Sequence, residues 1–370
     1  MVQFGSHTLC TDRRYRQPAS AEEAVDSLVV LLQTHGSDSS AAMGNMASNT
    51  VNQMAFCPPP PTYRKQDVNM WLETDKGNRI PAFHIRRGHP ITVLVSHANA
   101  EDLGIVLGFW TYMSDALQVD VFAYEYSGYG HSTGTPSEEN MYSDARAALQ
   151  LLVDGFKLKP ERDIVLYGKS IGSCPTCHLA SRTRVRGVMV VSGLASGSRV
   201  LFPTTKVYVM DMLYFNNIGR LKDSKSPVQI VHGTHDEIIP FSNGQDLHQA
   251  SGKYHPLPPA WIDGATHNNL ETVHSVAYMR AFRTFLKHLL ATPPNTPPPS
   301  KPGFFDWFPG VKQQQTPVTK VEPGPPANGT SSAASAGQGA AGPTSEPLPN
   351  PWARKGAAAP PDNGAPIPGS

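Results

Sequence analysis

The stretch that decides the fold is Ile164-Val165-Leu166-Tyr167-Gly168-Lys169-Ser170-Ile171-Gly172, an apolar run that passes directly into a G-x-S-x-G pentapeptide. The apolar run predicts a buried strand, and the residues after Gly172 have a helical pattern. Glycine on both sides of the serine permits a cramped strand-to-helix turn, which lifts the Ser170 hydroxyl above the sheet. The pattern and its position together indicate a serine nucleophile.

Short β-rich runs alternate with helical patterns on both sides of this turn, from about Thr62 to Leu290. We expect strands over residues 68–74, 79–86, 91–96, 119–124, 163–167, 187–192, 228–231 and 259–262. We expect helices over residues 103–117, 138–154, 171–182, 241–251 and 273–290. This alternation predicts an α/β domain with a mostly parallel sheet, helices on both faces and two antiparallel strands leading in.

A serine hydroxyl is a poor nucleophile at neutral pH, so it needs a histidine to take its proton and a carboxylate to orient that histidine. In this kind of fold the order along the chain is serine, acid, histidine. Asp236 follows the strand at 228–231, and His267 lies in a loop after the strand at 259–262. We therefore predict a triad of Ser170, Asp236 and His267. The neighbouring alternatives are Glu237 for the acid and His232 or His235 for the base.

Acyl transfer also requires two backbone N–H donors for the oxyanion. Ile171, which follows the nucleophile, is expected to supply one of them. The loop after the strand at 91–96 is expected to supply the other, from Asn99 or Ala100. His97, at the end of the same strand, is more readily explained as a structural residue than as a catalytic one.

Taken together, the motifs resemble the α/β-hydrolases of the domain-containing protein 17 type. The resemblance runs from about Ala55 to Leu290 and is carried by Phe56 with Tyr63, Ser96 to Ala100, Tyr126 to Gly130, Pro136 to Glu138, Tyr167 to Gly172, Ser196 to Asp211, and His232 to Thr234. The chain departs from the family at three points: Ala98 stands for a usual Gly, Lys169 for a usual Gln, and Ser192-Gly193 for a usual Ser-Pro.

The resemblance implies the α/β-hydrolase fold with a short lid, and it assigns the catalytic roles to the same Ser170, Asp236 and His267. It also implies a palmitoyl-protein thioesterase, whose partners are S-palmitoylated membrane proteins. Such an enzyme is expected to be a monomer at the cytoplasmic face of the plasma membrane or endosomes, and partly cytosolic. A thioester also suits the chemistry, because a cysteine thiolate is a good leaving group.

The segment from Ser196 to Leu221 is too long for a tight connection and too apolar for a solvated loop. We interpret it as the lid that forms an acyl groove, with a packing insertion as the alternative. A different serine hydrolase, acting on a lipid ester or a peptide, would keep the triad and change only this groove. A non-catalytic membrane-bound interaction module is the third possibility, although the intact triad argues against it.

Composition restricts the partners and cofactors. The 370 residues contain 31 Lys plus Arg against 30 Asp plus Glu, so no strong charge points to a nucleic-acid partner. Four scattered cysteines do not make a disulfide framework, and Cys174-Pro175-Thr176-Cys177 has no second pair, which favours packing over a zinc or redox role. No phosphate-binding motif is present, so we expect no metal and no cofactor.

The two ends of the chain differ from its middle, residues 62–290. Residues 291–370 hold 19 of the 35 prolines, so we expect a disordered tail, in which Phe304 to Phe308 is an aromatic island. Residues 1–61 are expected to be an extension that targets the chain to membranes. Met43-Gly44-Asn45-Met46-Ala47-Ser48 matches the myristoylation signal, which requires translation to begin at Met43, and Cys57 is a candidate palmitoylation site. No apolar run is long enough to span a bilayer.

Overall fold

The computed structural model describes residues 52, 55–68, 70–201, 214–251 and 257–294. These residues belong to one unit, which extends to Pro299. Three sequence-based expectations therefore lie wholly or partly outside the described residues: the myristoylation signal at Gly44, residues 202–213 of the predicted lid, and the tail after residue 294.

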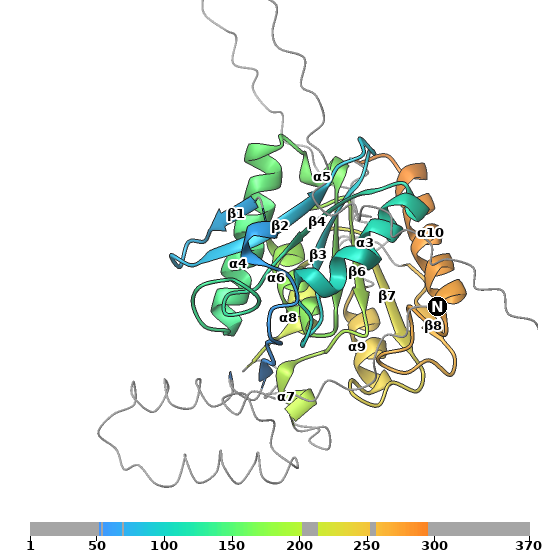
Figure 1. Ribbon diagram of the computed structural model, residues 1–370. Coiled ribbons are helices and arrows are strands. Elements are labelled where there is room, and N and C mark those ends of the chain that lie inside the picture. Colours follow the sequence, from blue (N-terminus) through green and yellow to red (C-terminus); the bar gives the residue numbers. More distant parts are fainter. Residues whose placement is uncertain (1–51, 53–54, 69, 202–213, 252–256, 295–370) are drawn as a thin grey trace, which may run out of the picture. The chain divides into compact units, whose positions relative to one another are not determined.

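A twisted sheet forms the centre of the domain (Figure 1). Its eight strands are β1 (Met70–Glu73), β2 (Arg79–Ile85), β3 (Thr92–Ser96), β4 (Asp120–Tyr124), β5 (Ile164–Lys169), β6 (Gly187–Val191), β7 (Val228–Gly233) and β8 (Ala260–Ile262), in the order β1-β2-β4-β3-β5-β6-β7-β8. β1 and β2 pair antiparallel, β2 also pairs antiparallel with β4, and every later pairing is parallel. The predicted sheet, with two antiparallel strands leading in, is confirmed.

Helices cover both faces of the sheet. The helices formed by the described residues are η2 (Lys65–Asp67), α3 (Leu103–Leu117), α4 (Glu138–Gln150), η3 (Leu151–Gly155), α5 (Pro160–Asp163), η4 (Ser170–Gly172), α6 (Ser173–Arg182), α7 (Gly197–Leu201), α8 (Asn217–Asp223), α9 (Phe241–Ser251) and α10 (Ser275–Ala291). α3 and α10 lie on one face, where Trp110 packs edge-on against Tyr167 and Phe282. α4, α6, α8 and α9 lie on the other face.

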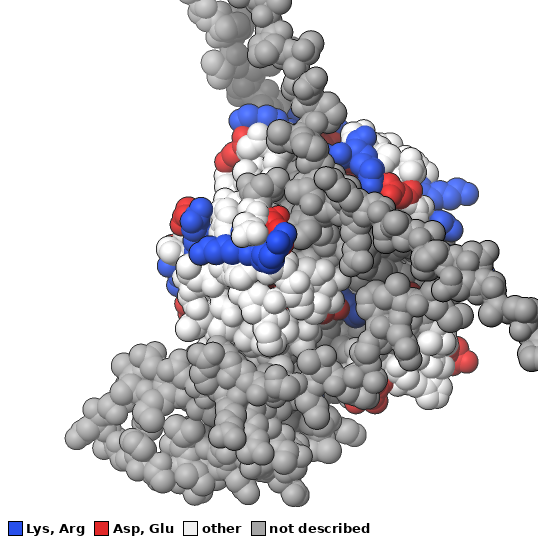
Figure 2. Space-filling model, viewed as in Figure 1, with Lys and Arg blue, Asp and Glu red and all other residues white. Residues whose placement is uncertain are grey.

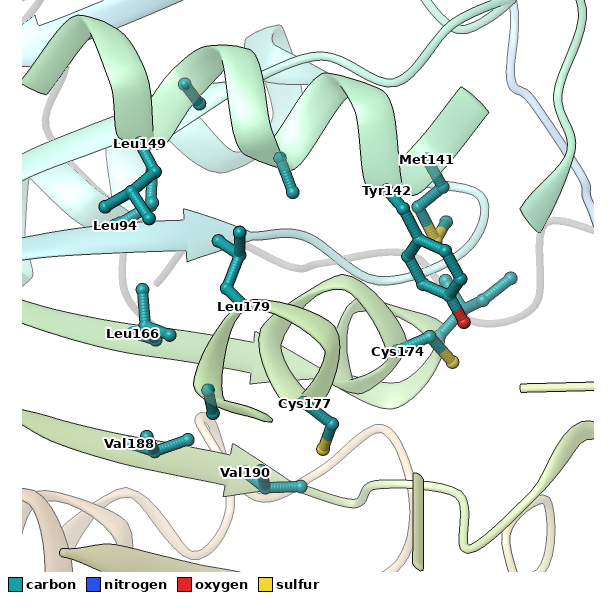
Figure 3. Close-up of a cluster of buried hydrophobic side chains, with 14 of the residues drawn as sticks. Leu94, Met141, Tyr142, Leu149, Leu166, Cys174, Cys177, Leu179, Val188 and Val190 are labelled. Atoms are coloured by element: carbon teal, nitrogen blue, oxygen red, sulfur yellow. The ribbon is translucent and has the colours of Figure 1, made fainter. Parts of the chain in front are cut away.

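The main apolar core lies between the sheet and the pair α4 and α6 (Figure 3). Side chains from the central strands, including Leu94, Leu166 and Val190, face Leu149 of α4 and Leu179 of α6. Near-complete burial of such side chains contributes about 1.5 to 3 kcal/mol each relative to exposure. This layer fixes α6, and therefore the turn that precedes it, against the sheet.

A strap of residues 55–63 precedes the first strand and is packed into the domain. Phe56 is 1% exposed and packs edge-on against Phe215. The backbone N–H of Thr62 donates to Asp102 at 2.6 Å, and the same carboxylate caps the N-terminus of α3 through the N–H of Ile105. The core therefore begins a few residues ahead of residue 62.

The surface agrees with the near-zero formal charge. On the face seen in Figure 2, acidic and basic side chains of the described residues are interspersed, and neither sign forms a continuous patch. Among the helices formed by the described residues, none is both long and apolar enough to cross a bilayer.

Candidate active site

The G-x-S-x-G segment forms a strained turn between β5 and α6. Ser170 has a φ of 54°, in the left-handed region that side chains other than glycine rarely adopt. Both glycines are required by close backbone approach: a Cβ on Gly168 would lie 2.3 Å from the carbonyl oxygen of Gly172, and a Cβ on Gly172 would lie 2.2 Å from that of Ser96. The turn is therefore pressed against both α6 and the end of β3.

The structure brings Ser170, His267 and Asp236 together from three separate loops. Nε2 of His267 lies 3.1 Å from Oγ of Ser170, and Nδ1 lies 2.9 Å from Oδ2 of Asp236. Because a carboxylate only accepts, Nδ1–H donates to Asp236, which leaves the Nε2 lone pair free to accept the serine proton. This is the geometry of a nucleophile, its base and the group that orients the base.

Asp236 is held by its own loop. Its Oδ1 accepts the N–H of Ile239 at 2.8 Å and that of Ile238 at 3.1 Å. Burial alone raises the pKa of this carboxyl, but the hydrogen bond and charge of His267, together with the N–H of Ile239, lower it below its ordinary value. Asp236 is therefore ionised at neutral pH and can stabilise an imidazolium.

The neighbouring alternatives occupy other positions. Glu237 accepts the backbone N–H of His267 at 3.2 Å, so it supports the loop of the base rather than its ring. His232 is buried; its Nε2 lies 2.9 Å from the carbonyl oxygen of Ile239 and 3.4 Å from Asp236. His235 contacts the hydroxyl of Thr234, on the exposed side of the loop.

The loop after β3 lies beside the nucleophile turn, as the contact of Gly172 with Ser96 requires. The N–H of Ala98 is already used, because it donates to Glu101 at 2.8 Å. Within the described part of the chain, the N–H groups of Asn99 and Ala100 have no acceptor. Ala100 has a φ of 56°. Both candidates for the second oxyanion donor therefore stay available, and the geometry does not separate them.

His97 braces this loop from inside. Its Nε2 lies 2.9 Å from Glu125 and its Nδ1 lies 2.9 Å from the carbonyl oxygen of Ala98. Burial by itself lowers the pKa of His97, but the hydrogen bond and charge of Glu125 raise it above the ordinary value. The residue is completely buried in a paired arrangement, in agreement with a structural role.

The cysteines of the C-x-x-C segment face the core (Figure 3). Cys174 and Cys177 are both fully buried on α6, and burial raises the pKa of the Cys177 thiol to about 12. Among the described residues, no group of three or more His, Cys, Asp or Glu side chains is arranged to hold a metal ion.

The candidate palmitoylation site, Cys57, is also buried. Its backbone N–H donates to Asn99 at 2.9 Å and to the hydroxyl of Tyr129 at 3.1 Å. An acyl chain could reach this sulfur only after the strap leaves the domain.

The described ends of the predicted lid are α7 and α8, with residues 202–213 outside the described residues. Phe215 lies at one of these ends, and it is 2% exposed and belongs to the main core. The segment is therefore anchored by packing at this end, while the groove prediction stays a prediction.

Sequence reasoning missed one residue of the site, Glu271, whose carboxylate lies 2.8 Å from the ammonium of Lys169. Lys169 stood out because it neighbours the nucleophile. Nothing in the sequence pattern marks Glu271, because it lies in an irregular loop with no periodicity.

Comparison with known proteins gives relatives for most of the described domain. No family model matches. Alpha/beta hydrolase domain-containing protein 17B of Homo sapiens is 36% identical over 250 residues, which cover 60% of this chain and 85% of the relative. Alpha/beta hydrolase domain-containing protein 17C of Xenopus tropicalis is 39% identical over 227 residues, with 60% and 71% covered. Among solved structures, an esterase of Pyrococcus furiosus has a similar fold, with a TM-score of 0.51 at 17% identity over 62% of this chain and 98% of that one.

Proposed function

Because the chain belongs to the alpha/beta hydrolase domain-containing protein 17 family, we propose that it is a serine hydrolase that cleaves palmitoyl thioesters from S-acylated cysteines of membrane-associated proteins. The observation that carries the hydrolase part of this proposal is the continuous hydrogen-bonded chain from Ser170 through His267 to Asp236. The thioester part rests on the leaving group and on the resemblance described above.

The first half of the reaction forms an acyl-enzyme. Oγ of Ser170 attacks the carbonyl carbon of the thioester while Nε2 of His267 takes the serine proton. The negative charge that develops on the carbonyl oxygen is stabilised by the N–H of Ile171 and by that of Asn99 or Ala100. The carbon–sulfur bond then breaks, and the departing thiolate takes the proton from the imidazolium, directly or through solvent, so that His267 is neutral again before the second half.

The second half releases the acid. His267 accepts a proton from a water molecule, whose oxygen attacks the acyl carbon of the Ser170 ester. The tetrahedral species collapses, the proton returns to Oγ of Ser170, and palmitate leaves. Throughout both halves, Asp236 keeps the imidazole in one tautomer and offsets its positive charge when it is protonated.

A fluorophosphonate probe tests whether Ser170 is the nucleophile, because it reacts only with an activated serine. Ser170→Ala is expected to abolish labelling and to reduce thioester hydrolysis by on the order of 10⁴-fold, without unfolding the domain. Ser192→Ala is the matched control: Ser192 is buried directly after β6, also with a positive φ, and its hydroxyl has no hydrogen-bond partner among the described residues. Full activity in Ser170→Ala, or loss of labelling in Ser192→Ala alone, contradicts the assignment.

A second comparison tests the substrate class. Hydrolysis of a palmitoyl-cysteine peptide is expected to exceed that of a glycerolipid ester with the same acyl chain, because the thiolate leaves more easily than an alkoxide. Hydrolysis of the oxygen ester at a similar or higher kcat/KM would favour a lipid esterase on the same triad, and cleavage of the peptide bond would favour a peptidase. Inactivity toward all three substrates, without probe labelling, would favour the interaction module.

For location, we propose that the hydrolase acts at the cytoplasmic face of membranes, held by myristate on Gly44 when translation begins at Met43. The sequence motif supports this proposal. A single myristoyl chain binds membranes only weakly, so a second contact is needed. Gly44→Ala is expected to move the protein toward the cytosol and to leave its rate on a soluble thioester unchanged. An intact mass without myristate on Gly44 would rule the proposal out.

A further inference from the structure

A buried ion pair ties the nucleophile turn to the loop of the base. Lys169 directly precedes Ser170, and its Nζ lies 2.8 Å from Oε1 of Glu271. Glu271 follows His267 by four residues in the same loop. The two side chains are only 14% and 11% exposed, which distinguishes the pair from the more exposed ion pairs of the surface.

We propose that Lys169 and Glu271 are positioning residues for the triad, which hold the loop of His267 against the turn of Ser170 and whose opposite charges cancel each other beside the imidazole. The inference rests on the proposed function, because it assumes that Ser170 and His267 carry out the reaction.

Lys169 keeps its charge although its side chain is nearly buried. Burial by itself lowers the pKa of Lys169, but the charges of Glu271 and Glu101 raise it above the ordinary value, so the ammonium stays charged. Glu101 belongs to the loop with the candidate oxyanion donors, where it binds the N–H of Ala98. Lys169 thus lies in the field of carboxylates from both loops that surround the nucleophile turn.

The groups that bear on the charge of this region are few. Lys169 is influenced by Glu271, Glu101 and Asp236. Glu271 acts on the phenols of Tyr167 and Tyr278, which are neutral at working pH because burial raises their pKa values well above 10. His267 contacts Ser170 and Asp236 through its ring and Glu237 through its N–H, and His232 lies behind Asp236.

Removal of one member leaves the other as an unbalanced charge near His267. Asp236, which contacts the imidazole, is among the charges that act on Lys169, so the ion pair lies within electrostatic reach of the triad. Without Lys169, the negative charge of Glu271 favours the imidazolium, which cannot accept the serine proton. Without Glu271, the positive charge of Lys169 disfavours the imidazolium.

The experiment measures kcat/KM of the full chain on a soluble thioester from pH 5 to pH 9. Lys169→Gln is expected to move the acidic limb of the profile to higher pH, and Glu271→Gln is expected to move it to lower pH, each by roughly 0.5 to 1 pH unit. The double variant is expected to return the limb to the wild-type position. Both single variants are expected to lower kcat about tenfold with little change in KM, because the loop is held less firmly.

Two results would overturn the inference. Either the acidic limbs of the pH profiles stay in place, or they move in the same direction in both single variants. A purely structural role would lower kcat without opposite shifts. If Lys169→Gln does not fold, Lys169→Met removes the same charge and has the same expected direction. Ser170→Ala is measured in parallel: if it keeps its turnover, the proposed function fails, whereas an inactive Ser170→Ala with unshifted limbs rejects only the role of the ion pair.

Discussion

Histidine side chains have different surroundings in two regions of the molecule. One region is the carboxyl-terminal edge of the sheet, and the other is the layer between the sheet and the helices α4 and α6. At the edge, His97, His232 and His267 each have a carboxylate within 3.4 Å. In the layer, His84 packs edge-on against Phe122 and Phe156, and His178 stacks on Tyr142 at 4.1 Å. Neither of these two has a carboxylate in contact among the described residues.

The two regions differ in how their surroundings affect a charged imidazole. In the layer, apolar surroundings penalise a charged imidazole, so burial lowers the pKa of His84 to about 4 and that of His178 to about 3. At the edge, the carboxylates oppose this penalty: Glu125 raises the pKa of His97 above its ordinary value, whereas burial still outweighs Asp236 at His232 and lowers its pKa. Three substitutions, one in each region and one where the regions meet, test this contrast.

The largest effect is expected at the edge, from removal of the charge that orients the base. Asp236→Asn should lower kcat by about 10⁴-fold, or roughly 5 kcal/mol of transition-state stabilisation, because the amide no longer fixes the imidazole tautomer. Glu237→Gln is the matched control and should cost less than about tenfold, since its side chain meets only a backbone N–H. Equal losses in the two variants would show that the acid has been wrongly assigned.

A smaller effect is expected where the two regions meet, at the turn before α6. Gly172→Ala adds a Cβ against the carbonyl oxygens of Ser96 and His97, so it should lower the free energy of unfolding by about 2 to 3 kcal/mol and displace both sets of oxyanion donors. Gly108→Ala, in α3 with nothing within 4 Å of the new Cβ, should instead stabilise the domain slightly. Denaturant unfolding of both variants checks this contrast.

The smallest effect is expected in the layer, and it depends on pH. The pKa of His84 is lowered in the folded state, so its contribution to stability is present above about pH 6.5 and is lost as the pH falls toward about 4. Between pH 8 and pH 5, the wild type should lose about 1 to 2 kcal/mol of unfolding free energy through His84. His84→Phe should not show this loss. The exposed His288→Gln should keep the wild-type dependence. Identical pH dependence in His84→Phe and the wild type would contradict the comparison.

The sequence predicted regular structure well where a pattern repeats. The predicted helices at 103–117 and 241–251 coincide with α3 and α9, and every predicted strand is present within a few residues. The predicted helix at 138–154 differs at its end, where Leu151–Gly155 forms a π-helix. One extra residue in a turn leaves the apolar spacing almost unchanged, so the pattern could not reveal it.

The site was predictable for a different reason. Chain order and strand ends identified Ser170, Asp236 and His267, because parallel strands bring their carboxyl ends to one edge of the sheet. The pairing of Lys169 with Glu271 could not be predicted, because it joins the end of a strand to a loop that has no regular spacing. The choice between Asn99 and Ala100 also depends on loop conformation, which local sequence does not encode.

The strap of residues 55–63 decides where this hydrolase can be shortened or joined to another protein. A cut at residue 62 would look safe from the sequence, yet it would remove the Phe56 ring from the core and the backbone bonds of Cys57 to Asn99 and Tyr129. Loss of a buried phenylalanine alone typically costs about 3 to 5 kcal/mol. Recombinant versions of the domain should therefore start at residue 52 or earlier, with any fusion partner attached ahead of that point.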